Sequence, residues 1–231
     1  MSLLANHGLI DSLDFGVQFV DAGAADAVGV GATSINLPYA ANMNGNIMIV
    51  HIAINDLTTT PTTPTGFTPM FADTDGSFVK MYTYFKYITG AESGSLPITL
   101  SSVNGVVIGR LYVFKNVRNP PPINESGGLA IVSYTYSPSS ITSTVSRSLA
   151  VSFAYLPNSD PGTAGYTTGA YTGNTGGTWV ERASAKTSVH NGAIITMQTA
   201  ALPIVGTISG GSYATDVGGL ALTRSFSLKA Q

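Results

Sequence analysis

The sequence of 231 residues predicts an all-β fold made of two packed antiparallel sheets. Apolar and polar residues alternate in segments of about seven to eleven residues, which is typical of strands with one buried face. Glycine, proline, serine and threonine fill the gaps between these segments, as they do in turns. No segment keeps a 3.6-residue period with helix caps, so we expect no helix in the core.

The clearest strand pattern lies in residues 148–156. The odd-numbered positions from Leu149 to Tyr155 carry large apolar side chains, and the even-numbered positions from 148 to 154 carry serine or alanine. Residues 219–229 repeat the pattern, with Leu and Phe on one face and Ala, Thr and Ser on the other. Each segment therefore has one face suited to a core.

Nine further segments complete the set of expected strands: residues 14–21, 34–37, 46–55, 78–88, 96–101, 106–115, 129–136, 179–185 and 193–200. About eleven strands exceed the needs of an immunoglobulin-like module and suit a larger two-sheet sandwich of jelly-roll type. Because no change in composition marks a boundary, we expect a single β-sandwich domain over residues 14–231. A short N-terminal arm over residues 1–13 precedes it.

Two of these segments, residues 46–55 and 106–115, are apolar on both faces. Strands of this kind belong at the centre of a sheet that is covered on both sides. The cover can come from the chain itself or from a partner protein on the outer face. The sequence leaves both alternatives open.

The composition excludes several classes of protein. Charged residues make up 10% of the chain, the net charge is −2, and the ten Lys and Arg are scattered, so no basic patch for nucleic acid is present. The absence of cysteine excludes disulfides, thiolate nucleophiles and cysteine-based zinc sites. Residues 1–8 lack the features of a secretory signal, and the apolar runs are too short to span a bilayer. We therefore expect synthesis in the cytoplasm and no membrane insertion.

No pattern of metal ligands stands out. His7, His51 and His190 lie apart from one another, without carboxylate or histidine neighbours at ligand spacing. His51 shares a face with apolar residues, so we expect a hydrogen-bonded core residue. The Asp-Thr-Asp-Gly run at 73–76 is expected to form a β-turn, and calcium held by this turn and a distant carboxylate is the alternative. No cofactor is predicted.

The chain shows no arrangement typical of a catalytic centre. The three glutamates, Glu92, Glu125 and Glu181, are isolated, whereas glycoside hydrolysis needs two carboxyl groups facing one cleft. No Gly-x-Ser-x-Gly sequence precedes a helix, so a serine nucleophile has no support. We predict that the protein is not an enzyme and has no catalytic residue. A glycan hydrolase in which Glu181 finds a partner is the enzymatic alternative.

The expected strand at 78–88 offers the most informative surface. Its outer face carries Lys80, Tyr82, Tyr84 and Lys86, a tyrosine pair flanked by two ammonium groups. Tyrosine supplies a large rigid ring with a polar tip, so this face is a candidate for a subunit interface or for contact with a glycan. The simpler interpretation is cross-strand packing of the tyrosines, with the lysine stems lying over apolar surface.

Two single residues are also informative. Arg224 interrupts the apolar face of the strand at 219–229, so its guanidinium needs a carboxylate or carbonyl partner, or a place at the sheet edge. It is a further candidate for contact with another subunit. Trp179, the sole tryptophan, is expected to fill a core.

Three loops have a distinctive composition. Residues 58–66 are rich in threonine and proline and favour an extended path, and residues 119–122 contain three consecutive prolines and should be stiff. Residues 158–178 are rich in glycine and threonine. We expect them to form a long loop that carries Tyr166 and Tyr171.

The order of these features resembles a group of tailed-bacteriophage virion proteins built on a jelly-roll sandwich. The motifs that carry the resemblance are Leu37-Pro38, Gly45-Asn-Ile-Met-Ile-Val-His-Ile52, Pro64-Thr-Gly-Phe67, Tyr82-Thr-Tyr-Phe-Lys-Tyr87, Ala91-Glu-Ser-Gly94 and Arg110-Leu-Tyr-Val-Phe-Lys-Asn-Val117. The resemblance covers residues 15–230 and departs from the pattern at Phe67, where a tryptophan is expected. It carries over no catalytic residue.

The resemblance implies a structural protein of the virion, attached to the outside of the capsid or to the tail. We expect a homo-oligomer, a trimer, whose partners are its own copies and the major capsid or tail proteins. The N-terminal arm and the proline-rich loops are the expected contacts. The alternative is a glycan- or receptor-binding module of a tail or fibre, which uses Lys80, Tyr82 and Tyr84, with Tyr166 or Tyr171, on a host-surface glycan.

Overall fold

The computed structural model describes residues 16–90, 92–119, 123–132, 135–136, 139–157, 177–187, 193–202, 204–209, 213–214 and 221–231. These residues form strands and contain no helix, which confirms the all-β prediction, and none of them belongs to a helix that would span a membrane. The strands are β1 (Gln18–Ala22), β2 (Asp26–Val28), β3 (Ser34–Pro38), β4 (Ile47–Ile54), β5 (Thr68–Thr74), β6 (Lys80–Tyr87), β7 (Ser95–Thr99), β8 (Val107–Lys115), β9 (Ile123–Val132), β10 (Thr135–Tyr136), β11 (Ile141–Ser143), β12 (Ser148–Pro157), β13 (Val180–Thr187), β14 (Ala193–Leu202), β15 (Gly206–Ile208), β16 (Tyr213–Ala214) and β17 (Ala221–Leu228).

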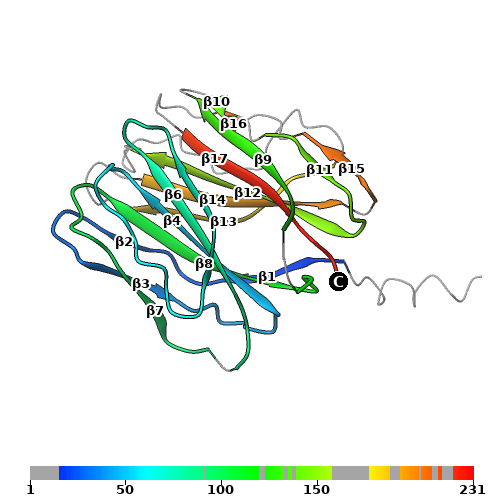
Figure 1. Ribbon diagram of the computed structural model, residues 1–231, viewed down its shortest axis with the longest axis horizontal. Coiled ribbons are helices and arrows are strands. Elements are labelled where there is room, and N and C mark those ends of the chain that lie inside the picture. Colours follow the sequence, from blue (N-terminus) through cyan, green and yellow to red (C-terminus); the bar gives the residue numbers. More distant parts are fainter. Residues whose placement is uncertain are drawn as a thin grey trace, which may run out of the picture.

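Two large antiparallel sheets pack against each other (Figure 1). The first sheet has the order β1-β8-β4-β6-β5, with β2 also paired to β8, and the second has the order β13-β14-β12-β17-β9. The two-sheet sandwich predicted from the sequence is therefore confirmed. The first sheet comes entirely from residues 18–115 and the second from residues 123–228.

The inner faces of the two sheets share one apolar core. Near one end of the sandwich Ile49 and Tyr112 of the first sheet belong to the same buried cluster as Phe153 and Phe226 of the second. Full burial of a side chain of this size contributes about 1.5–3 kcal/mol. The alternation seen in residues 148–156 places its large odd-numbered side chains in this inner core.

A ribbon made of β3 and β7 covers the outer face of the first sheet (Figure 1). Ile35 and Leu37 of β3 pack in one buried cluster with Val50 of β4 and Leu111 of β8. This ribbon explains why β4 and β8, at the centre of the sheet, are apolar on both faces. The chain supplies the outer cover itself, so the first of the two alternatives is confirmed.

A smaller ribbon made of β11 and β15 accompanies the second sheet. Ile141 and Ile208 of this ribbon share a buried cluster with Trp179 and with alanines of β12, including Ala150. The small even-numbered residues of β12 are therefore buried within the chain, and they do not form a surface for a second subunit. Trp179 fills a core, as predicted.

The two sheets have the same topology. The first sheet has the order β1-β8-β4-β6-β5, and the second, read from β9, has the order β9-β17-β12-β14-β13. In both of these five-strand orders the first strand in the chain lies at one edge, next to the last strand, and the third strand lies at the other edge. The ribbons correspond as well, because β11 and β15 take the places of β3 and β7. The fold is therefore a structural duplication, in which residues 16–118 form the first half and residues 123–231 the second.

An irregularity of register appears in both halves at the same place. The ladder between β5 and β6 skips one residue between Pro69 and Phe71. The ladder between β13 and β14 skips one residue between Glu181 and Ala183. A β-bulge bends the edge strand where it occurs, so the two edge strands share this local shape as well as their position.

The central strands also correspond residue by residue. His51 lies opposite Arg110 in the β4–β8 ladder, and Phe153 lies opposite Arg224 in the β12–β17 ladder. A constant offset of 114 residues relates Arg110 to Arg224 and Lys115 to Lys229. The duplication is therefore visible in the sequence of β8 and β17.

Within the first half the chain alternates between the sheet and the ribbon, which resembles the path of a jelly roll. After β4, Pro61 bridges to Leu100 and the Thr62 amide donates to the Thr99 carbonyl at 2.8 Å, so this extended segment lies beside β7. The extended path predicted for residues 58–66 is therefore confirmed at Pro61 and Thr62. Each half has its own sheet and ribbon, and the two sheets share the core of a single sandwich.

Candidate functional site

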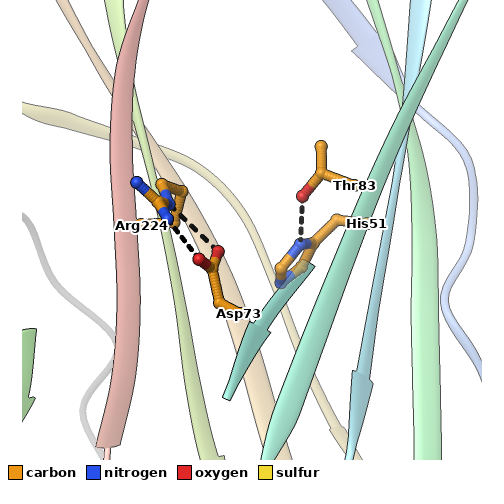
Figure 2. Close-up of polar contacts among 4 residues, drawn as sticks. All are labelled: His51, Asp73, Thr83 and Arg224. Carbon is orange, nitrogen blue, oxygen red and sulfur yellow. Dashed lines mark hydrogen bonds and ion pairs between the residues drawn. The ribbon is translucent and has the colours of Figure 1, made fainter. Parts of the chain in front are cut away.

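Arg224 of β17 and Asp73 of β5 form an ion pair between the two sheets (Figure 2). The Arg224 Nε lies 3.0 Å from Asp73 Oδ2, and Nη2 donates to Oδ1. The side chains are only 17% and 5% exposed, and the guanidinium lies 4.7 Å from the ring centroid of Phe71. The predicted carboxylate partner of Arg224 therefore comes from the same chain, which assigns this residue an internal role.

Arg110 makes the corresponding contact from the first half. Its Nε donates to the Gly23 carbonyl at 2.7 Å and its Nη1 to the Ser184 carbonyl of β13 at 2.8 Å. Arg224 reaches β5 and Arg110 reaches β13, so each arginine crosses to the corresponding edge strand of the other half. The two guanidinium groups hold the halves together without forming a reactive site.

His51 lies between the sheets and is fully buried. Its ring stacks on Phe153 with 4.3 Å between the centroids, and Nδ1 lies 3.3 Å from Thr83 Oγ1 (Figure 2). Nε2 has no hydrogen-bond partner among the described residues. Burial lowers the pKa of His51 to about 3, so the ring is neutral at pH 7. The predicted core role is confirmed; His7 and His190 lie outside the described residues.

The turn between β5 and β6 begins at Asp75, so the predicted turn holds for Asp75 and Gly76, whereas Asp73 and Thr74 end β5. Asp75 Oδ1 accepts backbone hydrogen bonds from Ser77, Phe78 and Val79 at 2.8–2.9 Å. Burial raises the pKa of Asp75, but these N–H donors outweigh it and hold the pKa below its usual value. Both carboxylates of the run thus have internal partners. The described residues include no group of three or more His, Asp or Glu arranged to hold a metal ion.

The two tyrosines of the face formed by Lys80, Tyr82, Tyr84 and Lys86 pack in the outer apolar cluster, which includes residues of the β3–β7 ribbon. Tyr84 is 4% exposed and belongs to the outer apolar cluster, and Tyr82 packs against the same cluster. Burial, with a smaller contribution from Tyr82, raises the pKa of Tyr84 to about 12. Tyr84 therefore has no ring face available to a sugar, and the cross-strand packing described as the simpler interpretation holds for this residue.

The two lysines of that face contact different loops. Lys80 Nζ donates to the Leu57 carbonyl and lies 3.4 Å from the Thr59 carbonyl. Lys86 Nζ pairs with Glu92 at 2.8 Å. The structure thus brings Lys80 and Lys86 to opposite ends of β6 and places Arg224 between the sheets, so the predicted residues do not form one site.

The strongest surface feature lies where four loops of the first half meet. Three large apolar side chains are exposed there: Val30 by 58%, Leu57 by 40% and Phe78 by 62%. Val30 follows β2, Leu57 follows β4 and Phe78 lies in the β5–β6 turn, and these strand ends adjoin one another in the sheet. We call the surface formed by these three residues the loop end.

Hydrogen bonds join the loops that carry this surface. The Gly31 amide donates to the Val103 carbonyl at 2.9 Å, and Asn104 Nδ2 donates to Thr58 Oγ1 at 2.7 Å. Lys80 links the loop after β4 to the beginning of β6 through the Leu57 carbonyl. The loops are therefore fixed relative to one another, and a partner would not have to order them.

Asp56 fixes the loop that carries Leu57. Its carboxylate accepts hydrogen bonds from the amide and hydroxyl groups of both Thr58 and Thr59. Burial raises the pKa of Asp56, but these hydrogen bonds outweigh it and lower the pKa below its usual value. This turn was not predicted from the sequence, although an Asp followed by Thr at the second and third positions is typical of an Asx turn.

The remaining candidates from the sequence are Glu181, Trp179, two loop tyrosines, the N-terminal arm and the proline-rich loop. One carboxylate oxygen of Glu181 is buried without a partner in the described part of the chain. Trp179 Nε1 donates to the Ser209 carbonyl at 2.9 Å, as befits a core residue. Tyr166 and Tyr171, the arm at 1–13 and the prolines at 120–122 lie outside the described residues.

Comparison with known proteins returned no relative. No family model matches this chain, and no curated protein or solved structure has significant similarity to it.

Proposed function

We propose that this protein is a non-enzymatic structural component of a bacteriophage virion. In this proposal homo-oligomers attach to the outside of the capsid or to the tail and bridge neighbouring subunits, so that each contact adds a barrier to dissociation. The partners are other copies of this chain and the major capsid or tail proteins. The motif resemblance from Leu37 to Val117 suggests this class of protein.

The observation that carries the proposal is the loop end. Leu57 and Phe78 expose apolar side chains on loops that are already fixed by Lys80, Asp56 and Asp75. The charged groups of these loops have partners within the chain, so the surface itself is weakly charged. A rigid apolar surface loses little side-chain entropy on docking, which favours a protein partner over a nucleic acid or a free anion.

The buried polar groups support a structural role for the rest of the molecule. Arg224 and Asp73 satisfy each other, Arg110 satisfies two carbonyl groups, and neutral His51 stacks on Phe153. These contacts hold the two halves in one arrangement. Such an interior suits a protein that has to keep its shape in an assembly.

A reconstitution experiment tests the proposal. Particles assembled without this chain are mixed with the purified protein and separated on a density gradient. Saturable cosedimentation that unlabelled protein competes away is the expected result. If the protein stays at the top of the gradient after mixing with particles from its own phage, the proposal is contradicted.

A glycan- or receptor-binding module is the second candidate, and one cluster of residues favours it. Lys86 and Glu92 form a half-buried ion pair, with Lys86 Nζ 6.0 Å from the ring centroid of Phe67. Tyr39 lies close enough that Glu92 adds to the effect of burial in raising its pKa, while Lys86 opposes them. Polar groups beside aromatic rings suit recognition of a sugar.

The two candidates predict different effects of substitutions in this cluster. If glycans bind here, Lys86→Ala and Tyr39→Ala abolish retention on immobilised host glycans and leave cosedimentation with particles unchanged. Tyr82→Ala tests, in the same assay, whether the partly buried tyrosine of the Lys80–Lys86 face contributes to glycan binding. Absence of glycan retention by the wild-type chain removes this candidate.

A further inference from the structure

The contact between the inner faces of the two halves contains buried polar atoms without partners. His51, Tyr112 and Tyr155 are fully buried, and His51 Nε2 and the two phenolic oxygens have no hydrogen-bond partner within the described part of the chain. The rings of His51 and Tyr112 both lie against Phe153, with centroid distances of 4.3 and 5.2 Å. A polar atom buried without a partner destabilises the contact that buries it, because water satisfies the same atom once the contact opens.

Each half also has a core that does not depend on this contact. The outer cluster around Ile35 and Leu111 contains residues of the first half only, and the outer cluster around Trp179 contains residues of the second half only. Both inner clusters, by contrast, contain residues of both halves. Separation of the inner faces would therefore leave the packing of each sheet on its own ribbon intact.

Among the described residues, the two halves share backbone hydrogen bonds at one end of the sandwich only. These bonds run from Val17 to Arg147, from Arg118 to Lys229 and from Gln231 to Asn116, with N···O distances of 2.8–3.2 Å. Asn116 also donates from its side chain to the Gly16 carbonyl at 3.1 Å, which brings the three bonds together. We call residues 116–118 and 229–231 the hinge end, because two layers that are held along one end can open at the other.

The loop end of the first half lies at the opposite end of the same strands. β4 begins at Ile47, which pairs with Phe114 beside the hinge end, and it ends at Ile54 beside the loop end. At this far end Val79 packs with the second half in an apolar cluster that includes Ala193. Apolar packing of this kind has no fixed direction, so it resists opening less specifically than the backbone pairing at the hinge end.

His51 lies between these two ends, in the middle of β4. The charged side chains that the inner strands place near the centre of the contact are Arg110 of β8, Arg224 of β17 and Asp73 of β5, and both oxygens of Asp73 are bound by Arg224. The neutral hydroxyl groups of Thr83 on β6, Tyr112 on β8 and Tyr155 on β12 complete the set. Burial lowers the pKa of His51 to about 3, and a proton on its Nε2 would have no acceptor among the described residues.

We propose that acid opens the contact between the two halves about the hinge end, and that each half stays folded as the contact opens. In the opened form water reaches His51, which takes up a proton, and water also reaches the hydroxyl groups of Tyr112 and Tyr155. This conformational change is a property of the chain itself. It does not depend on the proposed role in a virion.

The dependence on pH has a defined direction and size. His51 has a pKa of about 3 in the closed form and its ordinary value of 6.5 when water surrounds it, so below pH 6.5 the opened form binds a proton that the closed form does not. The ratio of opened to closed chains is constant above pH 6.5 and rises by about tenfold for each pH unit below it, until pH 3. Between pH 7 and pH 4 the increase is about 200-fold.

Distances between pairs of spin labels on the full chain test this proposal. The chain contains no cysteine, so two introduced cysteines carry the only labels. Phe78→Cys and Lys186→Cys label exposed positions on different halves, far from the hinge end. A population with a longer distance between these labels should appear in acid and grow by about tenfold per pH unit. Lys115→Cys with Ser146→Cys labels the hinge end and is the control pair, whose distance should not change.

Trp179 distinguishes opening from unfolding. It is the sole tryptophan and lies in the outer cluster of the second half, away from the contact between the halves. Its fluorescence should therefore stay the same at the pH where the Phe78–Lys186 distance lengthens. A change of both signals at the same pH would mean that the whole chain unfolds, and it would overturn the proposal.

Two substitutions separate the roles of the buried polar groups. In the labelled chain His51→Phe should make the ratio of opened to closed forms independent of pH between 6.5 and 4. Tyr112→Phe removes a hydroxyl without a partner and should lower this ratio severalfold at every pH, with the same slope. His51→Leu replaces His51→Phe if that variant loses its circular dichroism spectrum.

Two further results would overturn the proposal. One is a Phe78–Lys186 distance that stays unchanged down to pH 4 in the otherwise wild-type chain. The other is an acid response of the His51→Phe variant equal to that of the wild type. Neither result bears on cosedimentation with particles, so failure of this proposal and failure of the virion role are distinguishable.

Discussion

His51 of β4 and Phe153 of β12 occupy equivalent positions in the two halves and stack on each other, with 4° between their ring planes. In a two-fold arrangement, equivalent residues meet at the axis and other contacts occur in reciprocal pairs. Arg110 and Arg224 supply such a pair, since each reaches the edge strand of the opposite half. The chain therefore packs its duplicated halves as a subunit packs on its two-fold mate.

The stacked histidine makes stability sensitive to acid. The pKa of His51 is about 3 in the folded chain and 6.5 as its ordinary value, so below pH 6.5 the unfolded chain binds a proton that the folded chain does not. Stability is unaffected above pH 6.5 and falls as the pH drops from 6.5 towards 3. The loss is about 1.4 kcal/mol per pH unit, or about 3 kcal/mol by pH 4.

Urea unfolding between pH 8 and pH 4 measures this dependence. The matched variant is His51→Phe, which copies the residue at the equivalent position of the second half. The difference in unfolding free energy between wild type and variant should change by about 3 kcal/mol over this range. The contributions of all other titrating groups are the same in both proteins and cancel in this difference. Parallel pH profiles for the two proteins would contradict the role given to His51.

Removal of Asp73 should be strongly destabilising. Asp73→Ala leaves the Arg224 guanidinium between the sheets without its carboxylate, at an expected cost of about 3–5 kcal/mol. Glu92→Ala breaks the more exposed pair with Lys86 and should cost less than about 1 kcal/mol. Chemical denaturation of both variants checks the contrast. If both variants lost the same unfolding free energy, the ion pair between the sheets would contribute no more to stability than the more exposed pair.

The β5–β6 turn depends on Asp75. Asp75→Ala removes the acceptor for the amides of Ser77, Phe78 and Val79 and should cost about 1.5–3 kcal/mol. The same turn should not respond to calcium, so the wild-type melting temperature should be equal in calcium and in chelator. A calcium-dependent rise in this temperature would instead support the alternative in which this turn and a distant carboxylate hold calcium.

The N-terminal arm is expected to contribute to attachment. Deletion of residues 1–12 should lower the occupancy of particles in the cosedimentation assay and leave the melting temperature of the sandwich unchanged. The truncated chain keeps all the buried apolar residues of the described core, from Val17 to Ala230. Full occupancy by the truncated chain would remove the arm from the proposed contacts.

Strand alternation predicted much of the fold. All eleven expected segments contain strands, but β2, β5, β11, β15, β16 and the first part of β9 were missed. β5 shows the reason, since Pro69 and Asp73 weaken its pattern and only an edge strand accommodates them. The missed strands are short or lie at sheet edges. Strands of this kind bury little surface, so their apolar and polar residues alternate less clearly.

The duplication escaped prediction because the outer faces have diverged. Leu111 and Val113 of β8 pack under the β3–β7 ribbon, whereas the equivalent Ser225 and Ser227 of β17 are small and buried. The repeat survives mainly on the inner faces, where Arg110 corresponds to Arg224. Phe67 and Trp179 also correspond, each buried immediately before an edge strand, so the tryptophan expected at Phe67 is present in the second half.

The candidate site was predictable only in part. The sequence indicated that Arg224 needs a partner, but Asp73 is 151 residues away and no local pattern identifies it. The Lys80–Lys86 face was predicted as surface because its tyrosines alternate with lysines. Tyr84 instead belongs to a buried cluster with residues far away in the chain, such as Ile35 and Leu37, and strand alternation alone cannot reveal this burial.

Quantitative mass spectrometry of purified virions tests the central claim most directly, by counting copies of this chain against the major capsid protein. The account predicts a fixed stoichiometry, with hundreds of copies for a capsid position or a few dozen or fewer for a tail position. Absence of the chain from purified particles would contradict the proposal that it is a virion protein.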